Sequence, residues 1–259
     1  MNAIQNPTRS DRYDDDPSYD YSSYWNGRDY EHAAETLAIR RLLGARRFTR
    51  AVDVGGGFGR LSKLLTGYAE SVVLAEPSHH QLELAQRFLA DEPRIDRRQV
   101  AAADLRVPAG SVDLLLLVRV LHHVPDPRPE FAEFARVVQP GGTLLLEFAN
   151  SANLVSRLRF ARHGKRVPRH PVCPVATPEH GEWDMPFVNH CPATILAQLD
   201  LAGFDVQRVL SGSNLRSALL KRVLSLRVLL SLERVLQPVL APIRFGPSIW
   251  LVARRRTLG

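Results

Sequence analysis

Short apolar runs alternate with amphipathic stretches between residues 50 and 150. Runs typical of strands lie at 51–54, 71–75, 98–102, 112–118 and 143–148. Helical periodicity fills the intervals at 58–66, 78–89 and 129–138. Strands that alternate with helices of this size indicate right-handed βαβ units and a parallel sheet. The run VDLLLLV at 112–118 lacks polar alternation, which predicts a central strand covered on both faces.

The flanking segments have weaker patterns. Apolar residues at helical spacing over 31–43, ending at Gly44, predict a helix that packs against the following domain. Residues 163–191 are rich in Pro and His with little periodicity, which predicts a long ordered loop or a small cap. Periodicity resumes in a helix at 192–202, a strand at 204–210, a helical stretch at 215–236 and a strand at 248–253.

The composition is that of a soluble globular chain, with 45% hydrophobic and 24% charged residues among 259. Cys173 and Cys191 are expected to be free thiols in a reducing compartment. The Asp- and Tyr-rich start lacks the apolar core of a signal peptide, so we expect a disordered tail over 1–23 and a cytoplasmic protein. The net charge of +7 is concentrated after residue 150. This excess predicts a solvated basic face or, alternatively, a patch for an acidic partner.

The candidate chemistry begins at the end of the first strand, in the sequence AVDVGGGFGRLS. Asp53 is followed by Gly55, Gly56, Gly57, Phe58 and Gly59, and then by a helix. Glycines allow the backbone to turn sharply close to a ligand, and a helix start presents unpaired amide donors. In a doubly wound sheet this is where ligands bind. A dinucleotide fingerprint would need a small residue where this chain has Arg60, which disfavours a dehydrogenase.

Two further acidic residues follow expected strands. Glu76, followed by Pro77, ends the second strand, where a carboxylate can accept hydrogen bonds from two ribose hydroxyls. The stretch AAADL places Asp104 and Leu105 at the expected end of the third strand. Each acid alone could be a helix cap or a turn residue. Together with Asp53 they predict a nucleotide-like ligand.

The chain resembles the class I S-adenosylmethionine-dependent methyltransferases, in particular the small-molecule type 11 group that includes quinone and sterol methyltransferases. The resemblance rests on the pattern D-x-G-x-G-x-G, on these acids, on the sequence SVDLLLLVRVLHHVPDP and on the turn at 140–142. The resemblance covers about residues 24–148 and, more loosely, the C-terminal strands. It implies an α/β fold, a Rossmann-like doubly wound seven-stranded sheet that is mostly parallel, with an antiparallel last strand and helices on both faces. Insertions are expected after strand five and between strands six and seven.

The resemblance also implies a domain plan for residues 24–259, expected to be a single domain. Its expected parts are an N-terminal cover at 24–44, a cofactor-binding core at 50–150, a substrate cap at 151–192 and a C-terminal part at 193–259 with a helical insertion at 213–240.

Roles for individual residues follow from the same resemblance. The implied cofactor is S-adenosylmethionine, with Asp104 accepting from the adenine amino group and the amide of Leu105 meeting the ring. His122 and His123 follow strand four, where one imidazole could take a proton from the acceptor. The alternative for either is a helix cap or core packing. Arg119 could contact the cofactor through its backbone or the acceptor through its guanidinium.

Two flanking segments complete the expected site. The cluster of Tyr24, Trp25, Arg28 and Tyr30 resembles the N-terminal cover of this family, in which aromatic faces suit a sulfonium and Arg28 could pair with the methionyl carboxylate. Simple packing of an amphipathic arm is equally open. After strand five, Phe187, Asn189 and His190 are expected near the acceptor. A zinc site built from His170, Cys173, His180, His190 and Cys191 is disfavoured, because the spacing fits no usual finger; we expect no metal.

The predicted activity is transfer of a methyl group to an O, N or C atom of a small molecule, with lipids and quinones among the candidates. RNA or protein methylation and a non-catalytic cofactor-binding partner are the alternatives. Nucleic acid is disfavoured because no Asn-Pro-Pro-Tyr type of sequence follows strand four and no RNA module is present. The basic helix at 213–240 could lie on an anionic membrane surface, but its charges are scattered, which favours an insertion packed between strands six and seven.

Overall fold

The computed structural model describes residues 23–173 and 187–257. In chain order these residues form η1 (Ser23–Trp25), α2 (Asp29–Leu43), β1 (Phe48–Val54), α3 (Arg60–Leu65), β2 (Ala69–Glu76), α4 (His79–Phe88), β3 (Ile95–Gln99), β4 (Val112–Leu117), η2 (Leu121–His123), α5 (Arg128–Val137), β5 (Val138–Ala149), α6 (Leu154–Arg162), α7 (Pro192–Leu201), β6 (Phe204–Gly212), α8 (Ala218–Val223), α9 (Leu226–Val239) and β7 (Ser248–Arg255). The expected tail lies outside the described residues, apart from Ser23.

The strands form one seven-stranded sheet in the order β3-β2-β1-β4-β5-β7-β6. All neighbours from β3 to β5 are parallel, whereas β7 runs antiparallel to both β5 and β6. The mostly parallel sheet with an antiparallel last strand is therefore confirmed. Strand β4 lies between β1 and β5, and Leu114 to Leu117 are fully buried, as the unbroken apolar run predicted.

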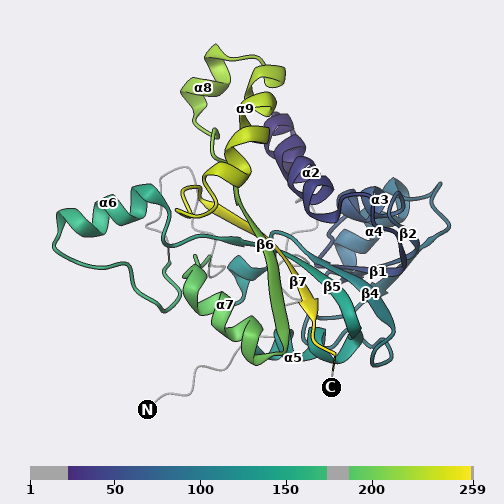
Figure 1. The fold of residues 1–259 in the computed structure, drawn as a ribbon. Helices are drawn as coiled ribbons and strands as arrows, with labels where there is room; N and C mark the ends of the chain where they lie inside the picture. Colours follow the sequence, from purple (N-terminus) through teal and green to yellow (C-terminus); the bar gives the residue numbers. More distant parts are fainter. Residues whose placement is uncertain (1–22, 174–186, 258–259) are drawn as a thin grey trace.

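Helices cover both faces of the sheet (Figure 1). On one face α2, α3 and α4 contribute Leu42, Leu65 and Ala85 to an apolar cluster with the strands. On the other face α5 and α7 contribute Phe131 and Leu199 to a second cluster. The two clusters make the sheet a rigid platform, so the loops at its carboxyl edge are held in fixed positions.

Several elements differ from their predicted form, and β5 begins five residues earlier than expected. Strand β3 begins and ends three residues earlier than expected, because it is an edge strand with polar residues and the apolar residues from 100 to 103 lie beyond it. The helical stretch at 215–236 is two helices, with Ser225 capping α9 through the N–H of Val228. Helix α6 lies in the expected cap at 151–192. It buries no residue, so the sequence has no apolar periodicity that would predict a helix there.

The carboxyl ends of the parallel strands meet at one edge of the sheet. The glycine turn after β1, η2 after β4, α6 after β5 and the helices α8 and α9 after β6 all start from this edge (Figure 1). Helix α9 packs on α2, where the Tyr30 hydroxyl donates to Glu233 at 2.9 Å and accepts from the N–H of Leu215 at 3.1 Å. In the described ranges no helix is long and apolar enough to cross a membrane.

Candidate functional site

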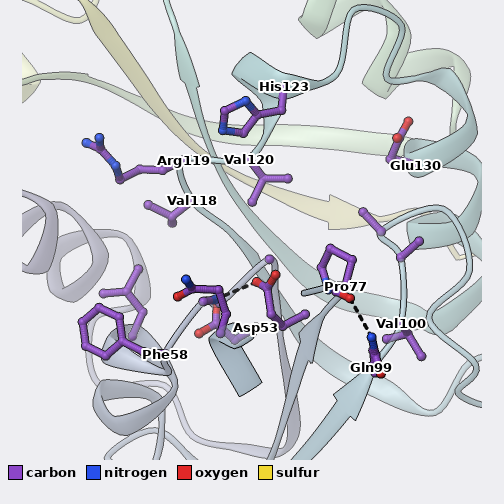
Figure 2. A pocket seen from close by; sticks show the side chains of 18 of the residues that line it. Asp53, Phe58, Pro77, Gln99, Val100, Val118, Arg119, Val120, His123 and Glu130 are labelled. Carbon is purple, nitrogen blue, oxygen red and sulfur yellow. Dashed lines mark hydrogen bonds between the residues drawn. The ribbon is translucent and has the colours of Figure 1, made fainter. Parts of the chain in front are cut away.

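A cavity of about 470 Å³ opens at the carboxyl edge of the sheet (Figure 2). Its walls come from the glycine turn, the end of β2, the start of α4, the segment after β3, the end of β4, η2 and the start of α5. The lining residues are Trp25, Asp53, Gly55, Gly56, Gly57, Phe58, Arg60, Leu61, Glu76, Pro77, Gln81, Gln99, Val100, Ala101, Ala102, Ala103, Arg106, Val118, Arg119, Val120, His123, Val124 and Glu130.

The glycine turn is held close to both neighbouring strands. The N–H of Gly55 donates to the carbonyl of Ala75 at 2.7 Å. Gly57 adopts a φ of +56°, a conformation that L side chains rarely adopt, and its N–H points to β2 rather than to solvent. A Cβ on Gly56 would lie 2.7 Å from Asp53 Oδ2 and would collide with Leu74. Gly55 and Gly56 therefore have no room for a side chain, because a Cβ would collide with Val120 or Leu74, while Gly59 precedes α3 and packs toward Leu89.

Asp53 lies beneath the turn and is 1% exposed. The Ser62 hydroxyl donates to its Oδ2 at 2.7 Å. Burial raises the pKa of Asp53 to about 6, although the hydrogen bond from Ser62 and the nearby charge of Arg60 oppose this rise. The carboxyl group therefore changes charge close to neutral pH, at the floor of the cavity.

Glu76 joins the end of β2 to the glycine turn. Its Oε2 accepts from the N–H of Gly57 at 2.9 Å, and its Oε1 accepts from the N–H of Ser78 at 3.0 Å. A carboxylate offers about four lone-pair directions, so each oxygen can still accept from a ligand hydroxyl. The side chain lines the cavity and is 5% exposed. The structure thus brings Asp53, the glycine turn, Glu76 and Pro77 together as the sequence predicted.

Gln81 is a cavity residue that the sequence did not reveal. It lies on the first turn of α4 and is 2% exposed. Neither its Oε1 nor its Nε2 has a hydrogen-bond partner among the described residues. A buried amide with both polar atoms unsatisfied is costly, and it marks a place where a ligand supplies the missing partners.

The segment after β3 corrects the expectation for Asp104 and Leu105. Because β3 ends at Gln99, the cavity is lined by residues 100–103, and Asp104 lies beyond them. The Asp104 carboxylate is 65% exposed and pairs with Arg106 at 3.2 Å. The N–H of Leu105 donates to Glu133 at 2.9 Å and so is committed to α5. Neither residue lines the cavity.

Arg119 lines the cavity at the end of β4 in a left-handed conformation, with φ of +60°. Its backbone N–H donates to Glu147 Oε2 at 3.0 Å, and burial raises the pKa of this glutamate. Its guanidinium pairs with Glu35 at 3.3 Å, and Glu35 also pairs with Arg60 at 2.6 Å. A non-glycine residue held at positive φ by buried partners is typical of functional sites.

The N-terminal cover reaches the cavity through one residue. Trp25 lines it, with the Arg60 guanidinium 3.6 Å from its ring centre. Tyr24 accepts from Arg119 and carries Arg28 stacked 3.8 Å above its ring. Tyr24 and Arg28 do not line the cavity, and their stacking matches the alternative of a packed arm; contact of Arg28 with a ligand carboxylate stays a prediction.

Only one of the two adjacent histidines faces the cavity. His123 lines it, and Figure 2 shows its ring on the wall opposite the floor formed by Asp53, with Glu130 on the same upper side. The ring of His122 stacks on Phe187, with 4.5 Å between ring centres. Burial, followed by the nearby charge of His123, holds the pKa of His122 well below its usual range, so this imidazole is neutral.

The residues expected near the acceptor support η2 from outside instead. Phe187 covers His122, while Asn189 pairs through its backbone with Val172. His190 is buried, with its Nε2 2.9 Å from the carbonyl of Leu121, and burial lowers its pKa. Since a carbonyl only accepts, Nε2 donates. Asn189 and His190 are absent from the cavity lining, and the backbone of His190 pairs with Asn150 just after β5.

The suggested zinc ligands are only partly described. His180 lies outside the described residues. Cys173 and Cys191 are free thiols, the first exposed and the second buried. Within 23–173 and 187–257 no three His, Cys, Asp or Glu side chains are grouped closely enough to hold a metal ion.

Comparison with known proteins shows what this part of the chain is similar to. Residues 52–146, which include the glycine turn, Glu76 and β4, match the family described as a methyltransferase domain. The match is limited to this part of the chain, and it agrees with the resemblance to the class I methyltransferases. The N-methyltransferase NodS from Bradyrhizobium japonicum, solved with S-adenosyl-L-homocysteine, shares its fold with a TM-score of 0.61 at 11% identity, covering 96% of this chain and 98% of that one.

Curated relatives match less than half of the chain. A demethylmenaquinone methyltransferase of Clavibacter sepedonicus is 31% identical over 113 residues, which cover 44% of this chain and 44% of the relative. A ubiquinone biosynthesis O-methyltransferase of Rhizobium etli is 31% identical over 102 residues, covering 39% and 41%. The chain thus spans less than half the length of these relatives.

The methyltransferase domain holds several cavity residues that the sequence reading missed, among them Gln81, Gln99, Arg106 and Glu130. Gln81 had one local signal, because it follows the cap Ser78 on the first turn of a helix that starts at the ligand edge. Glu130 had none: it lies in a helix predicted from apolar spacing, and a buried glutamate in a first turn also has a capping explanation.

Proposed function

We propose that the protein binds S-adenosylmethionine and transfers its methyl group to an O, N or C atom of a small molecule. The observation that carries this proposal is that Glu76 and Gln81 both line the cavity wall next to the glycine turn. An adenosyl group has two ribose hydroxyls that can donate to the buried Glu76 carboxylate. Its polar base can bond to the buried Gln81 amide, which has no partner among the described residues.

The residues proposed to hold the cofactor lie around the glycine turn. Glu76 would accept from the ribose hydroxyls while it keeps its bonds to Gly57 and Ser78. Gln81 would supply a donor and an acceptor to the adenosyl group. Residues 100–103 offer small apolar side chains on which a flat base can pack. Trp25 and Arg119 close the cavity on the side of the cover.

The bound cofactor supplies a methyl group on a cationic sulfonium. The chain aligns the acceptor with that methyl, excludes water and takes up any proton that leaves. We assign the proton to His123, because this histidine faces the cavity, whereas His122 does not line it and packs its ring against Phe187. Glu130 is a second titratable group on the same wall.

An apolar, quinone-like acceptor fits this proposal. The cavity wall near His123 is made of Val118, Val120 and Val124. The relatives named above are methyltransferases of menaquinone and ubiquinone biosynthesis by their names. Peripheral contact with a membrane through residues 213–240 belongs to the same proposal, because a polyprenyl acceptor resides in lipid.

Calorimetric titration with S-adenosylmethionine, S-adenosylhomocysteine and, as control, NAD tests cofactor binding. We expect dissociation constants on the order of micromolar for the first two and no heat with NAD. Absence of binding for both adenosyl compounds refutes the proposal. With binding established, labelled methyl transfer is measured across quinone, lipid and phenolic acceptors, and His123→Ala is expected to retain cofactor affinity while losing about 100-fold in rate.

A further inference from the structure

Helix α9 carries an exposed apolar stripe, which we call the α9 stripe: Val228, Leu232, Val235 and Val239. These residues are separated by four, three and four positions, so they share one face of the helix. Their exposed fractions range from 43% to 62%. The neighbouring Leu219 and Val223 of α8 and Ile243 after α9 are more than half exposed as well. Exposed apolar surface of this extent indicates an interaction site.

The opposite face of α9 fixes how the stripe is presented. Glu233 and Gln237 are fully buried against α2. Glu233 accepts from the Tyr30 hydroxyl at 2.9 Å and from the side-chain amide of Asn214 at 3.0 Å, and Gln237 Nε2 donates to the carbonyl of Ala34 at 3.0 Å. A helix held by buried polar bonds cannot rotate to hide its other face. The buried bonds of Glu233 and Gln237 therefore keep the α9 stripe on the outer face of the helix.

Cations flank the α9 stripe. Arg222, Arg227 and Arg234 are exposed, and none of them forms an ion pair within the described parts of the chain. Arg227 and Arg234 are seven residues apart and so share the face next to the stripe. Besides burial, the charge of Arg234 lowers the pKa of Arg41, so these cations lie close enough to repel each other.

Acidic groups do not balance these cations. Glu233 is the one acidic residue from 213 to 240, and it is buried with Tyr30. Glu31 of α2 is committed to Lys221 at 2.8 Å. The surface around the α9 stripe thus combines apolar side chains with uncompensated positive charge.

The stripe lies at the same edge of the sheet as the cavity. Helices α8 and α9 follow the carboxyl end of β6, and α6 follows that of β5 (Figure 1). The N–H of Leu154 at the start of α6 donates to the carbonyl of Phe245 at 3.1 Å, which ties α6 to the chain after α9. Helix α6 itself carries two exposed apolar residues, Val155 and Leu158.

We propose that the α9 stripe docks on the surface of an anionic phospholipid bilayer, with the cavity edge of the sheet toward the lipid. Apolar side chains enter the headgroup boundary while the flanking arginines meet lipid phosphates. A second copy of this chain fits less well, because a twofold contact would bring Arg227 and Arg234 against like charges. The docking itself is independent of the cofactor; only delivery of a lipid-borne acceptor rests on the proposed function.

Sedimentation of the full chain with vesicles tests the proposal. The vesicles are phosphatidylcholine alone, or phosphatidylcholine with about one third phosphatidylglycerol. We expect at least about tenfold stronger partitioning onto the anionic vesicles, and at least about tenfold weakening by Val235→Glu and by the double variant Arg227→Glu, Arg234→Glu. Raised salt is expected to weaken binding of the wild type.

Leu201→Glu is the matched control. Leu201 is 86% exposed and ends α7, at the opposite edge of the sheet from α9. This variant is expected to partition like the wild type, and calorimetry with S-adenosylhomocysteine in solution reports cofactor binding separately for each variant. Equal partitioning of wild type and Val235→Glu overturns the proposal. The proposal is also overturned if size-exclusion chromatography shows that the wild type is a dimer and that Val235→Glu is a monomer, because a second copy then covers the stripe.

Discussion

Replacing Glu76 by Gln tests the geometry of the cofactor site with the smallest change in shape. The two carboxylate oxygens accept from different backbone groups, Oε2 from Gly57 and Oε1 from Ser78. An amide has one oxygen and one NH₂ group, so in either orientation it faces one of these N–H donors with another donor. Because the side chain is 5% exposed, water cannot readily relieve that clash.

The expected loss follows from the number of bonds. A hydrogen bond to a charged group contributes about 1.5–3 kcal/mol. Glu76→Gln weakens at least one such bond in the free protein and removes charge assistance from the bonds proposed for the ribose. We expect the dissociation constant for S-adenosylhomocysteine to rise by about 10- to 100-fold, equivalent to about 1.4–2.7 kcal/mol.

Calorimetric titration measures this change, with Asp104→Asn as the matched control. The control makes the same chemical change in a carboxylate that is 65% exposed and lies outside the cavity. We expect Asp104→Asn to bind as tightly as the wild type. Unchanged affinity in Glu76→Gln would remove this residue from the site, and an equal loss in both variants would mean that net charge rather than contact geometry controls binding.

Three further predictions concern the floor of the cavity, the turn and the cover. The pKa of Asp53 is about 6 in the folded protein and ordinarily 3.8, so between these pH values the folded state binds more protons than the unfolded state. The free energy of unfolding therefore falls as pH rises from about 3.8 to about 6. Asp53→Asn is expected to remove up to about 3 kcal/mol of this fall, measured by urea denaturation across the pH range. Gly56→Ala is expected to weaken binding of S-adenosylhomocysteine by more than about tenfold through collision with β2, whereas Gly67→Ala, which meets nothing closer than 3.4 Å, binds normally in the same titration. Tyr30→Phe takes a donor from buried Glu233 and is expected to cost about 1–3 kcal/mol, seen as a lower Tm in thermal unfolding; an unchanged Tm would contradict the assigned bond.

The sequence by itself determined the sheet and the first half of the site. The apolar run of β4, the alternation of strands with helices and the glycine turn are encoded by neighbours in the chain. Hydrophobic period and backbone freedom are local properties, so they can be read without coordinates. Glu76 was predictable for the same reason, because it ends a strand at a fixed distance from the turn.

Only the tertiary structure decided which other side chains reach the cavity. Asp104 had the right chemistry, but an edge strand that ends at Gln99 leaves it in solvent. His122 and His123 are adjacent in sequence, but only His123 lines the cavity, while the ring of His122 packs against Phe187 from a distant segment. Gln81 lies in α4, and its amide can contact a ligand only because α4 starts at the edge where several strands end. Such neighbours are set by packing across the sheet, which no local pattern of residues records.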